Sequence, residues 1–244
     1  MISDYESLWL RFAPLGDDAR SFERLMDFLE RFGDENVLIR AQEVFHKVIN
    51  DGGVWFLETL DGDIVAITAV YRLGNWPYQW AEIGTTLVAP RYRGAQIQSA
   101  IYRHLISLMR LSDWPQKFLF AVANNNAVSS YTNLERLKFE RVRHVPGSLF
   151  FTNGFHGSWS IETGKRRLYL LSNSGIADAL DFVAANGPQH RLTDKEGKPR
   201  FWFCVNFAYL QQDGARDALK KMAEEIRRSE EARELIRSLR NKKK

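Results

Sequence analysis

The spacing of apolar residues predicts that helices and strands alternate along this chain. Apolar positions recur every three or four residues in 19–33 and again in 39–49, which is typical of amphipathic helices. Further on the period shortens to about two, and Asp61–Gly62 marks a hairpin turn between the first two strand-like runs. The elements expected up to residue 145 are helix, helix, strand, strand, strand, helix, strand, helix and strand, at 19–33, 39–49, 53–60, 63–73, 80–88, 95–111, 117–123, 126–138 and 139–145.

This order predicts an α/β (α+β) fold in which helices cover a mixed sheet. We expect the core of the fold to occupy residues 1–146, and residues 147–244 to form a C-terminal α/β extension. The extension carries further strand-like runs, a helix at 174–186 and a long charged helix at 213–240. The pattern leaves open whether these residues make a second small domain or add strands to the sheet.

Composition and charge restrict the class of protein. Of the 244 residues, 45% are hydrophobic and 26% are charged, as in soluble globular proteins. Neither a signal peptide nor an apolar run of roughly 18 residues is apparent, so we expect a cytoplasmic protein without a membrane span. A single cysteine, Cys204, excludes an internal disulfide, and the histidines lack metal-ligand spacing, so no metal is expected. The net charge of +4 owes much to the terminal RNKKK, for which a solvated tail is favoured over a nucleic-acid contact.

The segment after the third expected strand has the features of an anion-binding loop. The strand ends at Leu87–Val88, Pro90 removes a backbone donor, and Arg93–Gly94 precede a helix that begins near residue 95. The unpaired N–H groups and the positive dipole end of such a helix suit a diphosphate group. Glycine eases close approach, but every residue except proline has a backbone N–H, so Gln96 and Gln98 still permit binding if their side chains point outward.

This loop resembles the acyl-CoA loop of the GNAT superfamily of N-acyltransferases. The segment reads LVAPRYRGAQIQSAIYRHLI, and the family loop usually reads Val-x-Pro-x-x-Arg-Gly-x-Gly-x-Gly before a helix. Gln96 and Gln98 replace the two later glycines, which bears on the width of the site. The matching positions are Val88, Pro90, Arg93 and Gly94.

A second segment resembles another GNAT signature, Asn-x-x-Ala-x-x-x-Tyr followed by an apolar residue and Gly-Phe. Asn124, Ala127 and Tyr131 match its first part at the family spacing. The closing residues 137–139 arrive three positions late, with lysine where glycine is usual, and one extra helical turn would explain the delay. The other register places Leu134 at the tyrosine position; we favour the register with Tyr131.

The resemblance implies a GNAT-like, mostly antiparallel central sheet and acyl transfer from acetyl-CoA, or another acyl-CoA, to a primary amine. Glu82 matches the general base of the histone-acetylating branch, and Tyr131 would protonate the leaving thiolate. The cofactor positions are the backbone of Leu87 and Val88 for the pantetheine, Arg93, Gly94, Ala95, Gln96, Ile97, Gln98 and Ser99 for the pyrophosphate, and Asn124 and Asn126 on the cofactor side.

Other interpretations remain open at this stage. The donor can be a long-chain acyl-CoA or an acyl carrier protein, or the loop can be degenerate and the chain an interaction module. Glu82 can face solvent, Tyr131 can be a packing residue, and Asn124 and Asn126 can simply cap the helix that follows. The amine acceptor is not specified by any motif. The extension can shape specificity, form a homodimer or bind a macromolecule.

Overall fold

The computed structural model describes residues 8–16, 19–33, 42–73, 80–111, 118–142 and 166–241. Its strands are β1 (Trp9–Pro14), β2 (Val54–Thr59), β3 (Ile64–Leu73), β4 (Trp80–Val88), β5 (Phe118–Asn124), β6 (Phe139–Val142), β7 (Arg166–Leu171), β8 (Gln189–Thr193) and β9 (Pro199–Val205). Its helices are α1 (Ala19–Phe32), α2 (Gln42–Asn50), α3 (Ile97–Leu111), α4 (Val128–Arg136), α7 (Asn173–Asn186) and α8 (Ala215–Asn241), with 3₁₀ turns η2 (Pro90–Tyr92) and η3 (Ala208–Gln211).

All described strands belong to one nine-stranded sheet with the order β6-β7-β5-β4-β3-β2-β1-β9-β8. The pairs β4–β5 and β1–β9 are parallel, and the remaining neighbours are antiparallel. The expected mixed, mostly antiparallel sheet is therefore confirmed. The Asp61–Gly62 hairpin is confirmed as well, because Gly62 takes a left-handed φ of 88° in the turn between β2 and β3.

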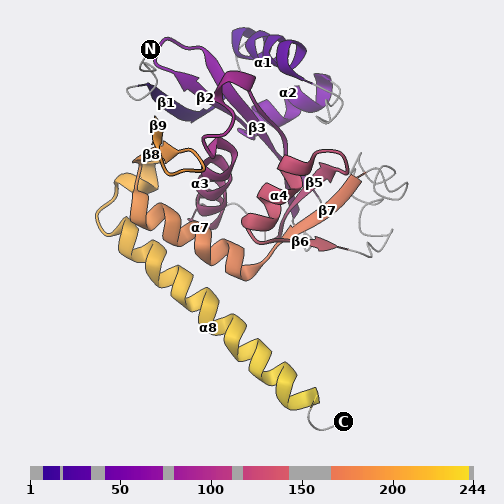
Figure 1. The fold of residues 1–244 in the computed structure, drawn as a ribbon, viewed down its shortest axis with the longest axis vertical. Helices are drawn as coiled ribbons and strands as arrows, with labels where there is room; N and C mark the ends of the chain where they lie inside the picture. The colour runs from indigo at the N-terminus through magenta and orange to yellow at the C-terminus, as the bar shows by residue number, and fades with distance from the viewer. Residues whose placement is uncertain are drawn as a thin grey trace.

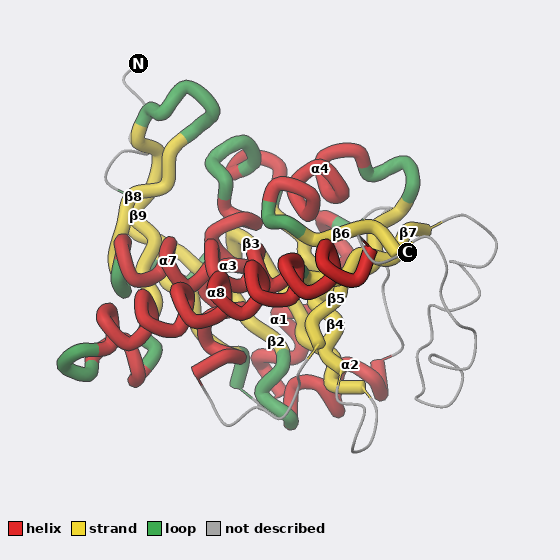
Figure 2. Tube along the Cα trace, turned by 90° about the horizontal axis from the view of Figure 1, so that it is seen from below, coloured by secondary structure: helices red, strands yellow, loops and turns green. Residues whose placement is uncertain are grey.

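The helices form layers on the sheet (Figure 1). Helices α3 and α4 each connect parallel strands in the same lateral direction, so the right-handed crossover rule places both on one face. The hydroxyl of Ser99 on α3 donates a hydrogen bond of 2.5 Å to the side-chain oxygen of Asn133 on α4, which joins the two helices. Helix α7 packs on α3, and α8 packs on α7 and then continues beyond the rest of the fold (Figures 1 and 2).

The strands of the C-terminal extension add to the sheet. β7 lies between β5 and β6, and the β8–β9 hairpin pairs with the edge of β1. Stacked rings support this edge: Trp9 and Trp202 lie with centroids 5.0 Å apart, and Phe12 and Phe203 with centroids 5.8 Å apart. The predicted boundary at residue 146 falls outside the described residues.

The sequence pattern did not predict the strands β1 and β8, and the prediction that the asparagines before α4 cap this helix is wrong. β1 is a short run that contains Arg11 and ends at Pro14, and β8 alternates over only five residues. The N-cap of α4 is Ala127, which makes no side-chain capping bond. Asn124 instead accepts the backbone N–H of Asn126 at 3.0 Å, so its side chain stabilises the turn before the helix.

Two histidines are buried where the extension meets α3. His104 of α3 and His190 of β8 are 0% and 7% exposed, and their rings stack with centroids 5.4 Å apart. None of the described residues forms a hydrogen bond with a ring nitrogen of either histidine. Burial lowers the pKa of His190 to about 4, with a further contribution from the positive charge of Arg103, and burial lowers the pKa of His104 well below its usual value. Both imidazoles are therefore neutral at pH 7.

None of the described helices is long and apolar enough to cross a lipid bilayer.

Candidate functional site

The two central parallel strands separate part of the way along the sheet. β4 and β5 pair at three positions, the last of which joins Glu82 to Phe120. Beyond it, β4 stays bonded to β3 as far as Val88, and β5 stays bonded to β7 as far as Asn124. Within the described residues, the facing edges of the two strands thus diverge and leave backbone N–H and C=O groups without a strand partner. An extended ligand with amide groups could insert between such edges.

A β-bulge lies in β4 where the strands part. Ile67 of β3 pairs with Leu87, but Ala69 pairs with Gly84, so the single residue between them faces both Thr85 and Thr86. Thr85 adopts a left-handed φ of 46°. A bulge bends and twists its strand, which gives a physical reason for the divergence of β4 from β5.

Hydroxyl groups fix the bulge on both faces of the sheet. Thr86 is hydrogen-bonded at 2.7 Å to Thr68 of β3 and at 3.0 Å to the hydroxyl of Tyr102 on α3. Thr85 is bonded at 2.5 Å to the hydroxyl of Tyr71. Burial raises the pKa of Tyr102, so its hydroxyl stays protonated and serves as a hydrogen-bonding anchor for α3.

The side chain of Glu82 is buried at the last paired position of β4, with 3% of the residue exposed. A Cβ atom placed on Gly84 would lie 3.1 Å from Glu82 Oε1 and 3.2 Å from Cε2 of Tyr71. Glycine at position 84 therefore leaves the room that the carboxylate occupies. The interpretation of Glu82 as a solvent-facing strand residue is wrong, and the carboxylate lies where the two strands begin to separate.

The loop between β4 and α3 presents the first turn of a helix at the open end of the strands. Arg93 is exposed, and its Nε donates to the carbonyl of Val88 at 3.0 Å, which closes the loop on itself. Gly94 takes a φ of 88°, and the methyl group of Ala95 is buried. Helix α3 then begins at Ile97, so the N–H groups of its first turn have no acceptor within the helix.

The glutamines of this loop differ in orientation. Gln96 is exposed, and its amide approaches the carbonyl of Asp194 at 3.5 Å. Gln98 is half-buried, and its amide donates to the hydroxyl of Tyr102 at 3.4 Å. Ser99, also in the first turn, turns its hydroxyl toward Asn133 of α4.

Two residues that stand where the GNAT patterns carry glycine keep the backbone conformation that glycine favours. Gln96 has a φ of 54° and Lys138 has a φ of 60°; with Thr85, they are the non-glycine residues with positive φ in the described part of the chain. A left-handed non-glycine residue costs roughly 1 kcal/mol, and the structure retains that conformation at both positions. Lys138 also pairs with Asp178 of α7 at 2.8 Å. The loop conformation is thus preserved although the glycines are not.

Tyr131 lies on α4, the helix that follows β5. Its ring is half-buried, and the guanidinium carbon of Arg167 lies 4.6 Å from the ring centroid. Arg167 Nε also donates to Asn125 at 2.7 Å. Sequence reasoning missed Arg167, Tyr102 and Asn133, because each reaches the site through tertiary packing.

The structure thus brings the predicted residues to one end of the sheet but distributes them over four elements, β4, the start of α3, the end of β5 and α4. Glu82, Leu87 and Val88 lie on β4, the loop residues lie at the start of α3, and Tyr131 lies on α4. Leu87 is buried, Val88 is half-buried, and Asn126 is exposed in the turn after β5. No three His, Cys, Asp or Glu side chains gather into a metal-binding group in the described part of the chain.

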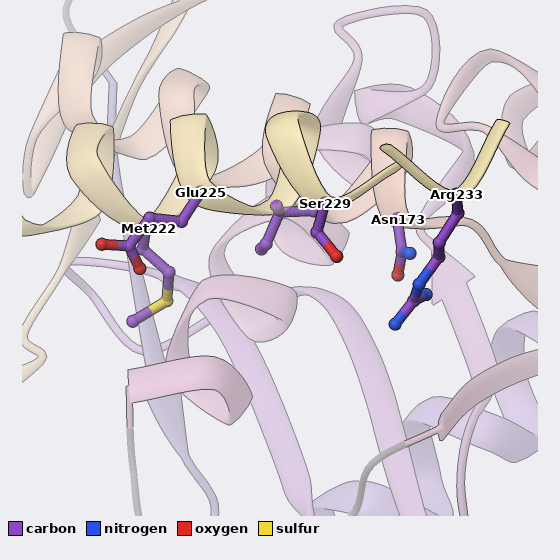
Figure 3. Close-up of a pocket in the computed structure, with 6 residues that line it drawn as sticks. Asn173, Met222, Glu225, Ser229 and Arg233 are labelled. Carbon is purple, nitrogen blue, oxygen red and sulfur yellow. The ribbon is translucent and has the colours of Figure 1, made fainter. Parts of the chain in front are cut away.

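Two cavities lie outside the gap between β4 and β5, and the second of them borders the loop that follows β4. One of about 270 Å³ lies between the start of α7 and the middle of α8, where Asn173, Met222, Glu225, Ile226, Ser229 and Arg233 line it (Figure 3). The other, of about 540 Å³, lies between α1 and the η2 turn and is lined by Arg24, Arg31 and Arg91 among others. Each of these arginines pairs with an acidic side chain: Arg24 with Glu58 at 2.8 Å, Arg31 with Asp27 at 3.4 Å and Arg91 with Asp63 at 3.6 Å.

Comparison with known proteins identifies the domain that carries this opening. Residues 19–134 match the family model described as acetyltransferase (GNAT) family. These residues are therefore a GNAT-family acetyltransferase domain, and additional C-terminal structure follows it. No curated protein matches the chain.

Solved structures share the fold at low sequence identity. Rv2747 from Mycobacterium tuberculosis, solved in complex with CoA, is 16% identical, with a TM-score of 0.51 over 66% of this chain and 97% of that chain. A chain of the NatC complex bound to Gag peptide and CoA is 10% identical, with a TM-score of 0.50 over 66% of this chain and 96% of that chain. These similarities concern the fold.

Proposed function

We propose that this protein transfers an acetyl group from acetyl-CoA to a primary amine by direct attack. The main support for the proposal is that β4 separates from β5 beyond Glu82. The start of α3, whose free N–H groups suit an anion, follows β4 at the end of this opening. A pantetheine arm has amide groups that can pair with the free strand edges, and a diphosphate suits the first helical turn. Both features of the donor thus have complementary groups in this part of the fold.

In this mechanism the backbone of Leu87 and Val88 orients the pantetheine and the thioester carbonyl, and the loop from Arg93 to Ser99 holds the diphosphate. In the same proposal Asn124, at the end of β5, and Asn126, in the turn after it, contact the cofactor. The amine nitrogen attacks the thioester carbon, and its proton passes to the carboxylate of Glu82, directly or through a water. The C–S bond then breaks, and the thiolate takes the phenolic proton of Tyr131. The products are an N-acetyl amide and CoA.

Calorimetric titration of the purified protein with acetyl-CoA and with CoA tests the cofactor site. We expect micromolar binding of both, followed by CoA release in a screen of primary amines. Absence of binding at millimolar concentration would contradict the proposal and direct attention to carrier-protein donors.

Variants of the two proposed catalytic residues test the chemistry. Glu82→Gln and Tyr131→Phe should each lower kcat by roughly 100-fold, the ordinary contribution of one acid–base group, while acetyl-CoA affinity stays within about twofold. Glu140→Gln, on an exposed position of β6, is the matched control. Turnover at the wild-type rate in both variants would remove these roles.

A further inference from the structure

The turn between β8 and β9, residues 194–198, lies against the loop that precedes α3. The side-chain amide of Gln96 approaches the backbone oxygen of Asp194 at 3.5 Å. The buried ring of Tyr92, two residues before Gly94, packs on Phe201 of β9 with centroids 5.5 Å apart. Two separate contacts therefore hold the hairpin of the C-terminal extension beside the anion-binding loop.

The strand directions place this turn and the loop at the same end of the sheet. β4, β3, β2 and β1 alternate in direction, and β9 runs parallel to β1. β8 is antiparallel to β9, so β8 and β4 run the same way. The turn that follows β8 and the loop that follows β4 therefore lie at the same end, which agrees with the contacts between them.

The turn carries cationic side chains that the fold leaves available. Its sequence is Asp194-Lys195-Glu196-Gly197-Lys198, and both lysines are exposed. The Asp194 carboxylate accepts the backbone N–H groups of Glu196 at 3.0 Å and Lys198 at 2.9 Å, so this acid is used inside the turn. In the described part of the chain, no carboxylate lies within ion-pair distance of the ammonium group of Lys195 or Lys198.

We propose that Lys195 and Lys198 bind the 3′-phosphate of CoA, so that the extension completes the cofactor site. This inference rests on the proposed function. CoA carries a diphosphate, which suits the first turn of α3, and a phosphate monoester on its ribose, which nearby cations would stabilise. The lysine-bearing turn is a charged element that the extension brings to this loop, and it lies beyond residues 19–134, where the family similarity ends.

Binding of CoA and of 3′-dephospho-CoA, measured by calorimetry on the full chain, tests this role. The wild type should bind CoA about tenfold more tightly than 3′-dephospho-CoA, which corresponds to about 1.4 kcal/mol. The double variant Lys195→Ala/Lys198→Ala should bind both compounds with the same affinity, equal to that of the wild type for 3′-dephospho-CoA. Lys220→Ala/Lys221→Ala, on an exposed part of α8, removes the same charge elsewhere and should keep the tenfold preference.

The outcomes separate this inference from the proposed function. Equal wild-type affinity for the two compounds would overturn the role of the lysines and leave the acetyl-CoA site intact. Equal loss of affinity for both compounds in the double variant would also overturn it, because the turn would then act on the loop rather than on the 3′-phosphate. If the wild type binds neither compound, the proposed function fails and this inference fails with it.

Discussion

Replacing His190 by leucine should make the stability of the protein less dependent on pH. His190 is 7% exposed, and its ring nitrogens have no hydrogen-bond partner in the part of the chain that the structure describes. Burial together with Arg103 lowers its pKa to about 4 from an ordinary value of 6.5. Below pH 6.5 the unfolded chain takes up a proton at this position, whereas the folded protein does so only near pH 4. The neutral His190 therefore makes its full contribution to the free energy of unfolding above pH 6.5, and this contribution is lost as the pH falls toward 4.

The size of the effect follows from the same linkage. Between the two pKa values, the free energy of unfolding changes by about 1.36 kcal/mol for each pH unit. Between pH 6.5 and pH 5 the wild type should therefore lose about 2 kcal/mol of its free energy of unfolding, and His190→Leu should not show this loss. The contribution of His104, whose pKa is also lowered by burial, is present in both proteins and largely cancels.

Urea unfolding followed by tryptophan fluorescence at pH 7, 6, 5.5 and 5 measures this difference. The free energy of unfolding of the variant minus that of the wild type should rise by about 2 kcal/mol over this range. The same substitution at His46, which is exposed on α2, is the matched control. A difference that stays constant within about 0.5 kcal/mol would refute the view that His190 is buried and neutral.

Two further substitutions examine the strand opening and the loop. Gly84→Ala should lower turnover roughly tenfold to a hundredfold with little change in acetyl-CoA affinity, because its Cβ would lie 3.1 Å from Glu82 Oε1. Steady-state kinetics measure the turnover, and calorimetry measures the affinity. Unchanged turnover would count against the catalytic position of Glu82. Gln96→Gly should raise the free energy of unfolding by about 1 kcal/mol and Tm by roughly 2–4 °C, because glycine accepts a φ of 54° without strain. Thermal melts of the variant and the wild type measure the change in Tm. A lower Tm in the variant would argue against strain at Gln96.

The elements around the loop could be predicted because their signals are local. A helix was expected to start near residue 95 and starts at Ile97, and the strand before it was expected over 80–88 and is found at those residues. Both follow from short-range periodicity and from Pro90 and Gly94, which act on their immediate neighbours. The end of α4 was expected near Lys138, and the helix ends at Arg136 with Lys138 in a left-handed conformation two residues later, which is also a short-range feature of the chain.

The opening itself could not be predicted, because it depends on pairings between distant segments. β4 carries Glu82 and two threonines among apolar and small residues, β5 is apolar as far as Asn124, and nothing in either strand indicates that pairing stops at Glu82. The bulge residue Thr85 has positive φ without being glycine or asparagine, so its sequence gives no signal. Arg167 meets Tyr131 only because β7 enters between β5 and β6, opposite Ala123. The roles of Glu82 and Tyr131 remain predictions.

The parallel pairing of β1 with β9 has a consequence for how this chain folds during synthesis. β1 is the first described strand, and its partner β9 begins only at Pro199, so β9 leaves the ribosome long after β1. Until then Trp9 and its neighbours present an unpaired strand edge, which another nascent chain could occupy. We expect closure of this edge to be a late and slow event, since contacts so distant in sequence form last. Truncation before β9 should therefore favour aggregation during expression.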